Sequence, residues 1–291
     1  MSLNLNTQGD EWTGARWYDL EDDKTGAVRR VFLWIPAGDP PKNGWRALYM
    51  TDGNAVIGTA IDVMRTQACY PAETNVQWGV LVAIGYPTNE AYDPLRRSWD
   101  LGPPPGRTYP PFYEGAEEVR TGGGQEMIRF IEEQVRPFVG AQTTLDPDQQ
   151  GLFGHSFGGL FALWWLFREP TAFKYWIAAS PAITWEDSFL LEHLDDFKTA
   201  PGELIVHLSA GEWEGDRLAP FQRTVKDAES RLKERAETQT IAAAEDMAKK
   251  LANIAGVSAF YETYRHENHM SVLPVAVNRA IQCVFECDAE P

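Results

Sequence analysis

Short apolar runs alternate with stretches of helical periodicity along most of the chain. The apolar runs, typical of strands buried on both faces, occupy residues 46–51, 79–85, 150–154, 174–180, 203–210 and 257–264. Helical stretches occupy 55–68, 125–139, 157–168 and 271–286. Parallel strands need crossover helices and are covered on both faces. The pattern therefore predicts the α/β class, as one domain over residues 1–291 with a mostly parallel sheet and helices on both faces.

Three segments depart from this alternation. Residues 15–36 hold two β-rich runs around an Asp-Lys-Thr-Gly turn, which predicts an amino-terminal β-hairpin. Residues 87–124 are rich in Pro and Gly, and irregular chain of this length is typical of a substrate loop or lid. Residues 217–255 are rich in Ala, Glu and Lys, which predicts a helical excursion with a solvated charged face.

Composition and charge narrow the possible partners. The 291 residues are 44% hydrophobic and 23% charged, which is typical of a globular protein. The net charge of -16 repels phosphate backbones and anionic lipid surfaces. We therefore expect a small-molecule ligand, and neither nucleic acid nor membrane as a partner.

The cysteines and the amino terminus indicate a compartment. Cys69, Cys283 and Cys287 show no CxxC spacing, so neither a disulfide framework nor a zinc site is indicated, and no feature calls for a metal or an organic cofactor. The amino terminus has no basic region followed by an apolar one, and no apolar run is long enough for a membrane span. These features predict a cytoplasmic protein, or a periplasmic one if an export signal was removed.

The first candidate for chemistry is Gly154-His155-Ser156-Phe157-Gly158, which matches Gly-x-Ser-x-Gly. It lies between a predicted strand and an apolar predicted helix, the setting in which this motif presents a nucleophilic serine on a sharp turn. The alternative is a tight turn with an idle serine. The setting favours Ser156 as the nucleophile of a serine hydrolase.

A serine nucleophile needs a base, and in folds with this motif the order along the chain is nucleophile, acid, histidine. His193 and His207 lie in a predicted amphipathic helix and an apolar strand and are interpreted as structural. His266 and His269 lie in the loop between the last strand and the last helix. We expect His269, the nearer to the helix, to be the base.

The orienting acid should follow the strand that ends at Ala210, where Glu212, Glu214 and Asp216 lie. Glu214 is three residues past Gly211, a position where related hydrolases often carry the acid, so it is preferred. The alternative is an acid-rich loop that is simply solvated.

An oxyanion hole needs two backbone N–H donors. The amide of Phe157, directly after the serine, is one candidate, and the amide of Asn54, in the loop after the strand at 46–51, is the other. A compatible alternative is an Asp-Gly turn with Asn54 capping the helix at 55–68.

With these residues on the page, the chain resembles the esterase D branch of the α/β-hydrolases, and within it the siderophore trilactone (enterochelin and salmochelin) esterases that lack a separate amino-terminal domain. The resemblance covers residues 15–286 and is carried by LYMTDGNAV, AIGYPTN, GHSFGGLFAL, AASPAI and ENHM, in that order. It implies the α/β-hydrolase fold. It also implies hydrolysis of a cyclic triester of catecholoyl-serine, ferric or iron-free, through an acyl-enzyme on Ser156 with His269 as base. Arg97 matches an arginine associated with the catecholate in that family.

Two departures from the family pattern leave questions open. The periplasmic family member has an amino-terminal hydrophobic anchor, which this sequence lacks. Esterases of that type use a Ser–His pair without a clear acid, whereas this chain offers several acids. A Ser–His dyad and a complete triad therefore both stay open.

A ferric tris-catecholate is a trianion, so an acidic protein needs a local basic patch to bind it. The segment 87–124 offers four arginines beside aromatic residues, a combination that suits a planar anion. The candidate substrate-binding residues there are Arg97, Arg96 and Trp99, with Arg107, Arg120, Tyr109 and Tyr113 nearby. The alternative is that the arginines form surface ion pairs with Asp93, Asp100, Glu114, Glu117 and Glu118.

Two other functions compete with the siderophore esterase. A short-chain carboxylesterase or an S-formylglutathione-type hydrolase would use the same catalytic residues, but its small acyl substrate would not need the loop at 87–124. A non-catalytic binding protein is disfavoured because serine, acid and histidine occur in the expected order.

Overall fold

The computed structural model describes residues 8–9 and 14–287 and shows two compact units. Unit one runs to Gly151 and resumes at Ala280, and unit two comprises Leu152–Arg279. The prediction of a single domain over the whole chain stays a prediction.

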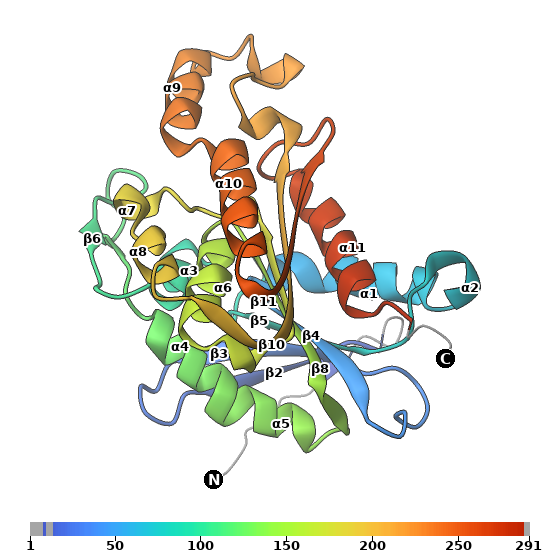
Figure 1. The fold of residues 1–291 in the computed structure, drawn as a ribbon. Coiled ribbons are helices and arrows are strands. Elements are labelled where there is room, and N and C mark those ends of the chain that lie inside the picture. Colours follow the sequence, from blue (N-terminus) through green and yellow to red (C-terminus); the bar gives the residue numbers. More distant parts are fainter. Residues whose placement is uncertain (1–7, 10–13, 288–291) are drawn as a thin grey trace. The chain divides into compact units, whose positions relative to one another are not determined.

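The strands of unit one follow the order β1-β2-β3-β5-β4-β8 (Figure 1). The hairpin predicted for 15–36 is present, since β2 and β3 pair antiparallel. β3 pairs antiparallel with β5, and β5 pairs parallel with β4. The bounds are β1 Gln8–Gly9, β2 Arg16–Glu21, β3 Val28–Trp34, β4 Trp45–Met50, β5 Val80–Gly85 and β8 Leu145–His155, whose last residues belong to unit two.

The segment 87–124 is more regular than the sequence predicts. It contains α3 (Pro94–Leu101) and a short ribbon of β6 (Thr108–Tyr109) and β7 (Val119–Arg120). Asp93 caps α3 by accepting a hydrogen bond from the Arg96 amide, and Pro94 occupies the first helical position. These local start signals were hidden among the prolines that indicated irregular chain. The other helices of this unit are α1 (Gly53–Gln67), α2 (Pro71–Thr74), and α4 (Gly124–Phe130), η1 (Ile131–Val135) and α5 (Arg136–Gly140), the last three occupying the helix predicted at 125–139.

A buried ionic network joins the hairpin to α3 and α4. Asp22, in the hairpin turn, accepts hydrogen bonds from the Lys24 and Thr25 amides and from the Arg129 guanidinium at 2.7 and 2.9 Å. Arg29 donates to Asp22 and, through two nitrogens, to Asp100 at 2.6 and 2.8 Å. Asp100 is thus paired with Arg29 of the hairpin and not with an arginine of its own segment.

The strands of unit two follow the order β8-β9-β10-β11, and β10 (Thr199–Gly211) pairs parallel with both β9 (Tyr175–Ala179) and β11 (Ala255–Tyr264). Its central helix α6 (Phe157–Arg168) is buried continuously from Gly158 to Phe167, as its apolar sequence predicts. Trp165 packs edge-on against Phe173 and Trp176. The remaining elements are η2 (Pro170–Ala172), α7 (Trp185–Ser188), α8 (Leu190–Leu194), η3 (Glu212–Glu214), η4 (Pro220–Gln222), α9 (Ala228–Thr238), α10 (Thr240–Ala252) and α11 (Val272–Val284), which ends in unit one.

The helical segment predicted at 217–255 consists of two different helices. α10 buries Ala244, Met247, Ala248 and Leu251 and packs on β10 and β11. α9 has no buried residue. Figure 1 shows α9 at the end of α10 that lies nearest the carboxyl ends of β10 and β11.

Candidate active site

Ser156 lies on a strained turn between β8 and α6. Its φ of 58° and ψ of -115° are sparsely populated for a residue with a side chain. A Cβ on Gly154 would collide with the backbone carbonyl of Gly158, so this position requires glycine. Glycine therefore lets the first turn of α6 approach β8 closely and sets the serine at the end of the strand.

The three side chains that the sequence singled out form one chain of hydrogen bonds within unit two. The Ser156 hydroxyl donates to Nε2 of His269, with 3.0 Å between the two atoms. Nδ1–H of His269 donates to Oε2 of Glu214 at 2.6 Å. This is the geometry in which a histidine removes a proton from a serine while a carboxylate fixes its tautomer.

The competing candidates lie elsewhere. The His266 side chain is 68% exposed and lies near Glu212, which accepts a hydrogen bond from the His266 amide. Asp216 is 94% exposed and contacts Arg217. His207 is buried in β10 and His193 lies in α8, the elements predicted for them. Neither these histidines nor these acids contact Ser156 or His269 through any hydrogen bond that the described residues show.

Glu214 is almost completely buried, and its surroundings keep it ionised. Burial raises the pKa of the carboxyl, but the hydrogen bond from His269, the one from the Ser180 hydroxyl at 2.6 Å and the one from the Gly211 amide at 2.7 Å outweigh it. The net effect is a pKa below the ordinary value. Glu214 therefore carries a negative charge at neutral pH beside the Nδ1–H of His269.

Sequence reasoning missed two residues that support this arrangement. Ser180, at the end of β9 with a φ of 44°, bonds the second oxygen of Glu214. His155, buried beside the serine, has its Nε2 2.8 Å from the carbonyl oxygen of His269, to which it donates, and the two rings lie 4.8 Å apart. The sequence held one signal for each residue. Ser180 is a polar residue directly after a buried strand, and His155 is a polar residue inside the serine motif.

The two predicted oxyanion donors lie in different units. The Phe157 amide is in the first turn of α6, where helix N–H groups lack intrahelical acceptors. Asn54 lies in the first turn of α1 and does not cap that helix, since the residue at the cap position is Asp52. The Asn54 side chain instead bonds the amide and carbonyl of Tyr86 and the carbonyl of Thr88. Its role as an oxyanion donor stays a prediction.

Each unit contains a cavity. The cavity in unit one has a volume of about 580 Å³, and the cavity in unit two, which contains Ser156, has a volume of about 550 Å³. It is lined by Ser156, Glu214 and His269, by Trp185 of α7, and by charged residues of α9. The α9 residues are Arg231, Glu234, Arg235, Glu237 and Thr238. α9 has no buried residue, so its charged face is solvated as expected, and these side chains border the cavity as well.

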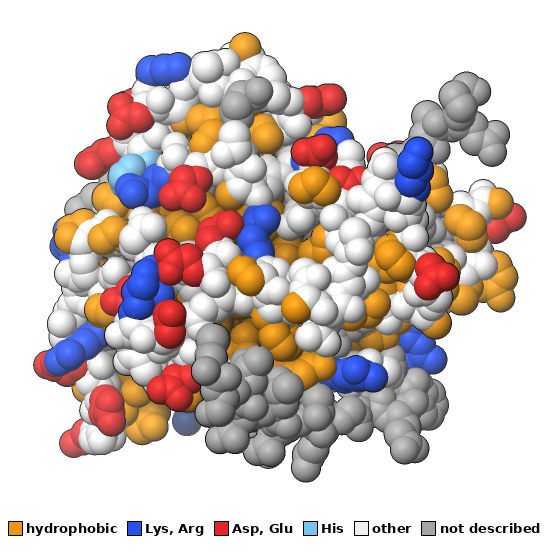
Figure 2. Space-filling view, turned by 90° about the horizontal axis from the view of Figure 1, so that it is seen from below, with side chains coloured by type: hydrophobic (Ala, Val, Ile, Leu, Met, Phe, Trp, Pro, Cys, Tyr) orange, Lys and Arg blue, Asp and Glu red, His pale blue; other side chains and the backbone are white. Residues whose placement is uncertain are grey.

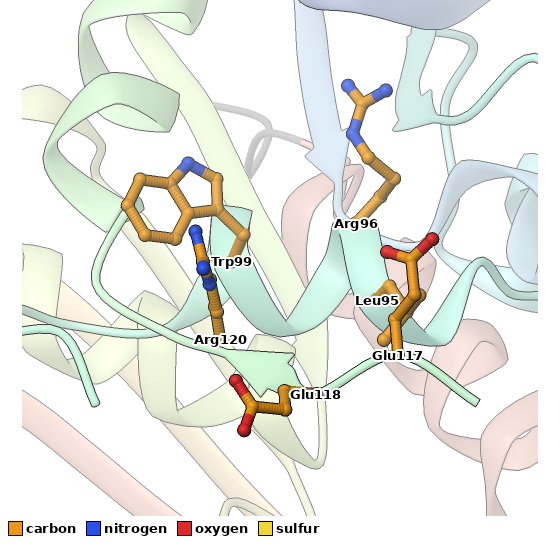
Figure 3. Close-up of a pocket in the computed structure, with 6 residues that line it drawn as sticks. All are labelled: Leu95, Arg96, Trp99, Glu117, Glu118 and Arg120. Carbon is orange, nitrogen blue, oxygen red and sulfur yellow. The ribbon is translucent and has the colours of Figure 1, made fainter. Parts of the chain in front are cut away.

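The predicted substrate-binding residues all lie in unit one. Arg96 and Trp99 line its cavity with Leu95, Glu117, Glu118 and Arg120 (Figure 3). Arg97 does not line it. The Arg97 guanidinium forms a two-point ion pair with the buried carboxylate of Asp52, at 2.8 and 2.9 Å. Its charge is therefore neutralised inside the protein.

Positive and negative side chains are mixed on one face of the molecule. On the face shown in Figure 2, Lys and Arg side chains lie next to Asp and Glu side chains. No helix within residues 8–9 and 14–287 has the length and apolarity needed to cross a bilayer. Across the same part of the chain, no three His, Cys, Asp or Glu side chains gather as a metal site requires.

Comparisons with known proteins agree with the fold and with an esterase activity. Residues 23–267 match the family model described as a putative esterase. The ferri-bacillibactin esterase BesA of Bacillus subtilis is 32% identical over 262 residues, which cover 89% of this chain and 85% of that protein. The siderophore triacetylfusarinine C esterase of Aspergillus fumigatus is 32% identical over 82% of this chain and 81% of its own length.

Solved structures give the fold. The siderophore hydrolase EstA from Aspergillus nidulans superposes with a TM-score of 0.79 at 27% identity, covering 94% of this chain and 95% of that one. The predicted α/β-hydrolase fold and the resemblance to siderophore esterases are thereby confirmed. The chain belongs to the putative esterase family of α/β-hydrolases.

Proposed function

We propose that this protein is a serine esterase that hydrolyses the ester bonds of a siderophore through an acyl-enzyme on Ser156. The observation that carries the proposal is the unbroken chain of hydrogen bonds from Ser156 through His269 to the buried Glu214, inside a cavity. The esterase family and the relatives named as siderophore esterases support it.

Each residue has one role in the proposed mechanism. Nε2 of His269 takes the hydroxyl proton as Ser156 Oγ attacks the ester carbonyl, and the Phe157 amide donates to the developing oxyanion. His269 returns the proton to the leaving alkoxide, so the alcohol departs and the acyl group stays on Oγ. Water then attacks the acyl-enzyme with His269 again as base, which releases the acid and restores the hydroxyl. Glu214 holds the Nδ1–H of His269 throughout and stabilises the imidazolium.

The proposed substrate is a siderophore with ester links, and its hydrolysis would serve iron release or siderophore processing. The relatives' names span bacillibactin, enterobactin, salmochelin and triacetylfusarinine C, which have in common that they are siderophores. A catecholate trilactone is the member of this group that we favour.

The nucleophile is tested with Ser156→Ala. We expect loss of covalent labelling by a fluorophosphonate and a fall in kcat of roughly five orders of magnitude, because the acyl-enzyme cannot form. Labelling of the variant at the wild-type rate would place the nucleophile elsewhere.

The substrate is tested by mass spectrometry of products from a panel of ferric and iron-free siderophores, with simple aryl esters alongside. Hydroxy acid fragments from the siderophores support the proposal. Cleavage of the aryl esters alone would leave the serine chemistry standing and favour a short-chain carboxylesterase.

A further inference from the structure

One guanidinium in the cavity of unit two has only neutral hydrogen-bond partners. Arg235 of α9 donates through Nη1 to the carbonyl oxygen of Arg217 at 2.7 Å and through Nη2 to Oε1 of Gln222 at 2.9 Å. No acid forms an ion pair with it among the described residues. By contrast, Arg231, one turn earlier, is paired with Asp227 at 2.8 Å.

Arg235 presents a positive charge to the cavity that it lines. Burial lowers the pKa of its guanidinium, and the charge of Glu214 acts in the opposite direction, but an arginine stays protonated in either case. Glu234 and Glu237 line the same cavity, and Glu237 also contacts Lys233 at 3.9 Å. A guanidinium has five N–H donors, and the two bonds to Arg217 and Gln222 leave others for a ligand.

Placement distinguishes Arg235 from the arginines of unit one. It lines the cavity that contains Ser156 and His269, and Gln222 and the Arg217 carbonyl hold its planar fork in one orientation. A guanidinium fixed in this way is preorganised for a planar anion such as a carboxylate or a catecholate. Arg97, to which the sequence assigned this task, is occupied by Asp52.

We propose that Arg235 binds the anionic oxygens of the substrate and so sets a preference for esters that carry a negative charge beside the reacting acyl group. This inference rests on the esterase function proposed above and adds the residue that would recognise the negative charge of the substrate.

The first experiment compares two esters of matched size, the para-nitrophenyl esters of succinate and butyrate, which differ by a terminal carboxylate. In Arg235→Gln, we expect the ratio of kcat/KM for the anionic ester to that for the neutral ester to fall about tenfold or more, the scale of a charge-assisted hydrogen bond. Arg235→Lys should restore the ratio only in part, because it keeps the charge and loses the fork.

Lys233→Gln is the matched control. It removes the same charge from the same helix, but Lys233 is 81% exposed and does not line the cavity, so the ratio should not change. An equal loss on both esters in Arg235→Gln would make Arg235 a purely structural residue and overturn the proposal. The same holds if Lys233→Gln lowers the ratio as much, since the effect would then be one of net charge.

The second experiment needs no turnover and separates this inference from the esterase function. Calorimetry on the Ser156→Ala protein compares a dihydroxybenzoate with its neutral amide. We expect the acid to bind more tightly, and the added Arg235→Gln change to weaken the acid about tenfold and the amide much less. If the wild type cleaves no ester, this result still decides the role of Arg235. Equal affinity for the acid with and without Arg235, or no binding of the acid, would overturn it.

Discussion

At the scale of single residues, sequence order singled out the side chains that the structure brings together. Ser156, Glu214 and His269 each follow a strand of a parallel sheet, and the carboxyl ends of such strands meet at one edge. Ser180 and His155 could not be found in this way. Their contacts with Glu214 and with the His269 carbonyl depend on how the ends of β8, β9 and β10 pack, which no local pattern encodes.

Glu214→Gln tests whether the carboxylate completes a triad. The neutral amide can present an N–H to Nδ1 and hold the wrong tautomer, so we expect kcat to fall roughly a hundredfold to ten-thousandfold, less than for Ser156→Ala. Steady-state kinetics on an aryl ester measures it. Glu212→Gln and Asp216→Asn serve as controls, because neither side chain touches His269. A wild-type rate for Glu214→Gln would instead favour a Ser–His dyad.

His269→Ala should resemble Ser156→Ala in kcat, because no other base lies on the serine hydroxyl among the described residues. His266→Ala should retain most activity, since its ring is exposed and contacts Trp213 and Glu212. Both are measured with the same aryl ester. The reverse ranking would show that the loop presents the other histidine to the serine.

At the scale of elements, strands and long helices were predictable and the functional segments less so. The run that forms α6 was matched at both ends, because its continuous apolar stretch begins at the glycine-bearing serine motif and stops before Pro170, which cannot continue the helix. α3 was missed because prolines and glycines around it indicated a loop. The role of α9 was missed because a helix that borders a cavity is as polar as one that faces solvent.

Gly154→Ala tests the close approach of β8 and α6 that presents Ser156. The new Cβ would meet the backbone of Gly158 and Gly159, which cannot move aside as a flexible side chain could. We expect destabilisation by about 2 kcal/mol or more, the range of overpacking and backbone strain, together with slower fluorophosphonate labelling. Chemical denaturation and labelling kinetics measure the two effects.

Gly58→Ala is the matched control for this change. A Cβ at Gly58, within α1, meets nothing within 4 Å, and alanine is favoured over glycine in a helix by about 1 kcal/mol. That variant should be as stable as the wild type or more so. Equal stability of the two variants would mean that α6 shifts freely away from β8.

At the scale of the whole molecule, composition gave the charge but not its arrangement. A net charge of -16 argues against polyanionic partners, yet it does not tell which arginines are neutralised inside the fold. Arg29 and Arg97 are each paired with buried aspartates, while Arg235 has neutral partners. Long-range pairs of this kind, such as Arg29 with Asp100, join residues that no spacing rule connects.

The network around Asp22 predicts how stability depends on pH. Burial alone raises the pKa of this carboxyl, but Arg129 and the Lys24 and Thr25 amides dominate and lower it to about 2. Because the folded pKa lies below the unfolded value of 3.8, the stabilisation is fully present above about pH 4 and is lost as the pH falls towards 2. The shift corresponds to about 2 kcal/mol of unfolding free energy. Asp22→Asn should remove this pH-dependent contribution to the free energy of unfolding.

Asp23→Asn is the control for that measurement, because it removes the same charge from an exposed neighbour whose contact with Arg129 is longer, at 3.7 Å. Urea denaturation of the three proteins at several pH values between about 2 and 7 gives the comparison. We expect Asp22→Asn to be less stable than the wild type at neutral pH and the difference to shrink below about pH 4, while Asp23→Asn follows the wild type. Parallel curves for the wild type and Asp22→Asn at all pH values would show that Asp22 titrates alike in the folded and unfolded chain, so that the ionic network joining the hairpin to α3 and α4 contributes nothing that depends on its charge.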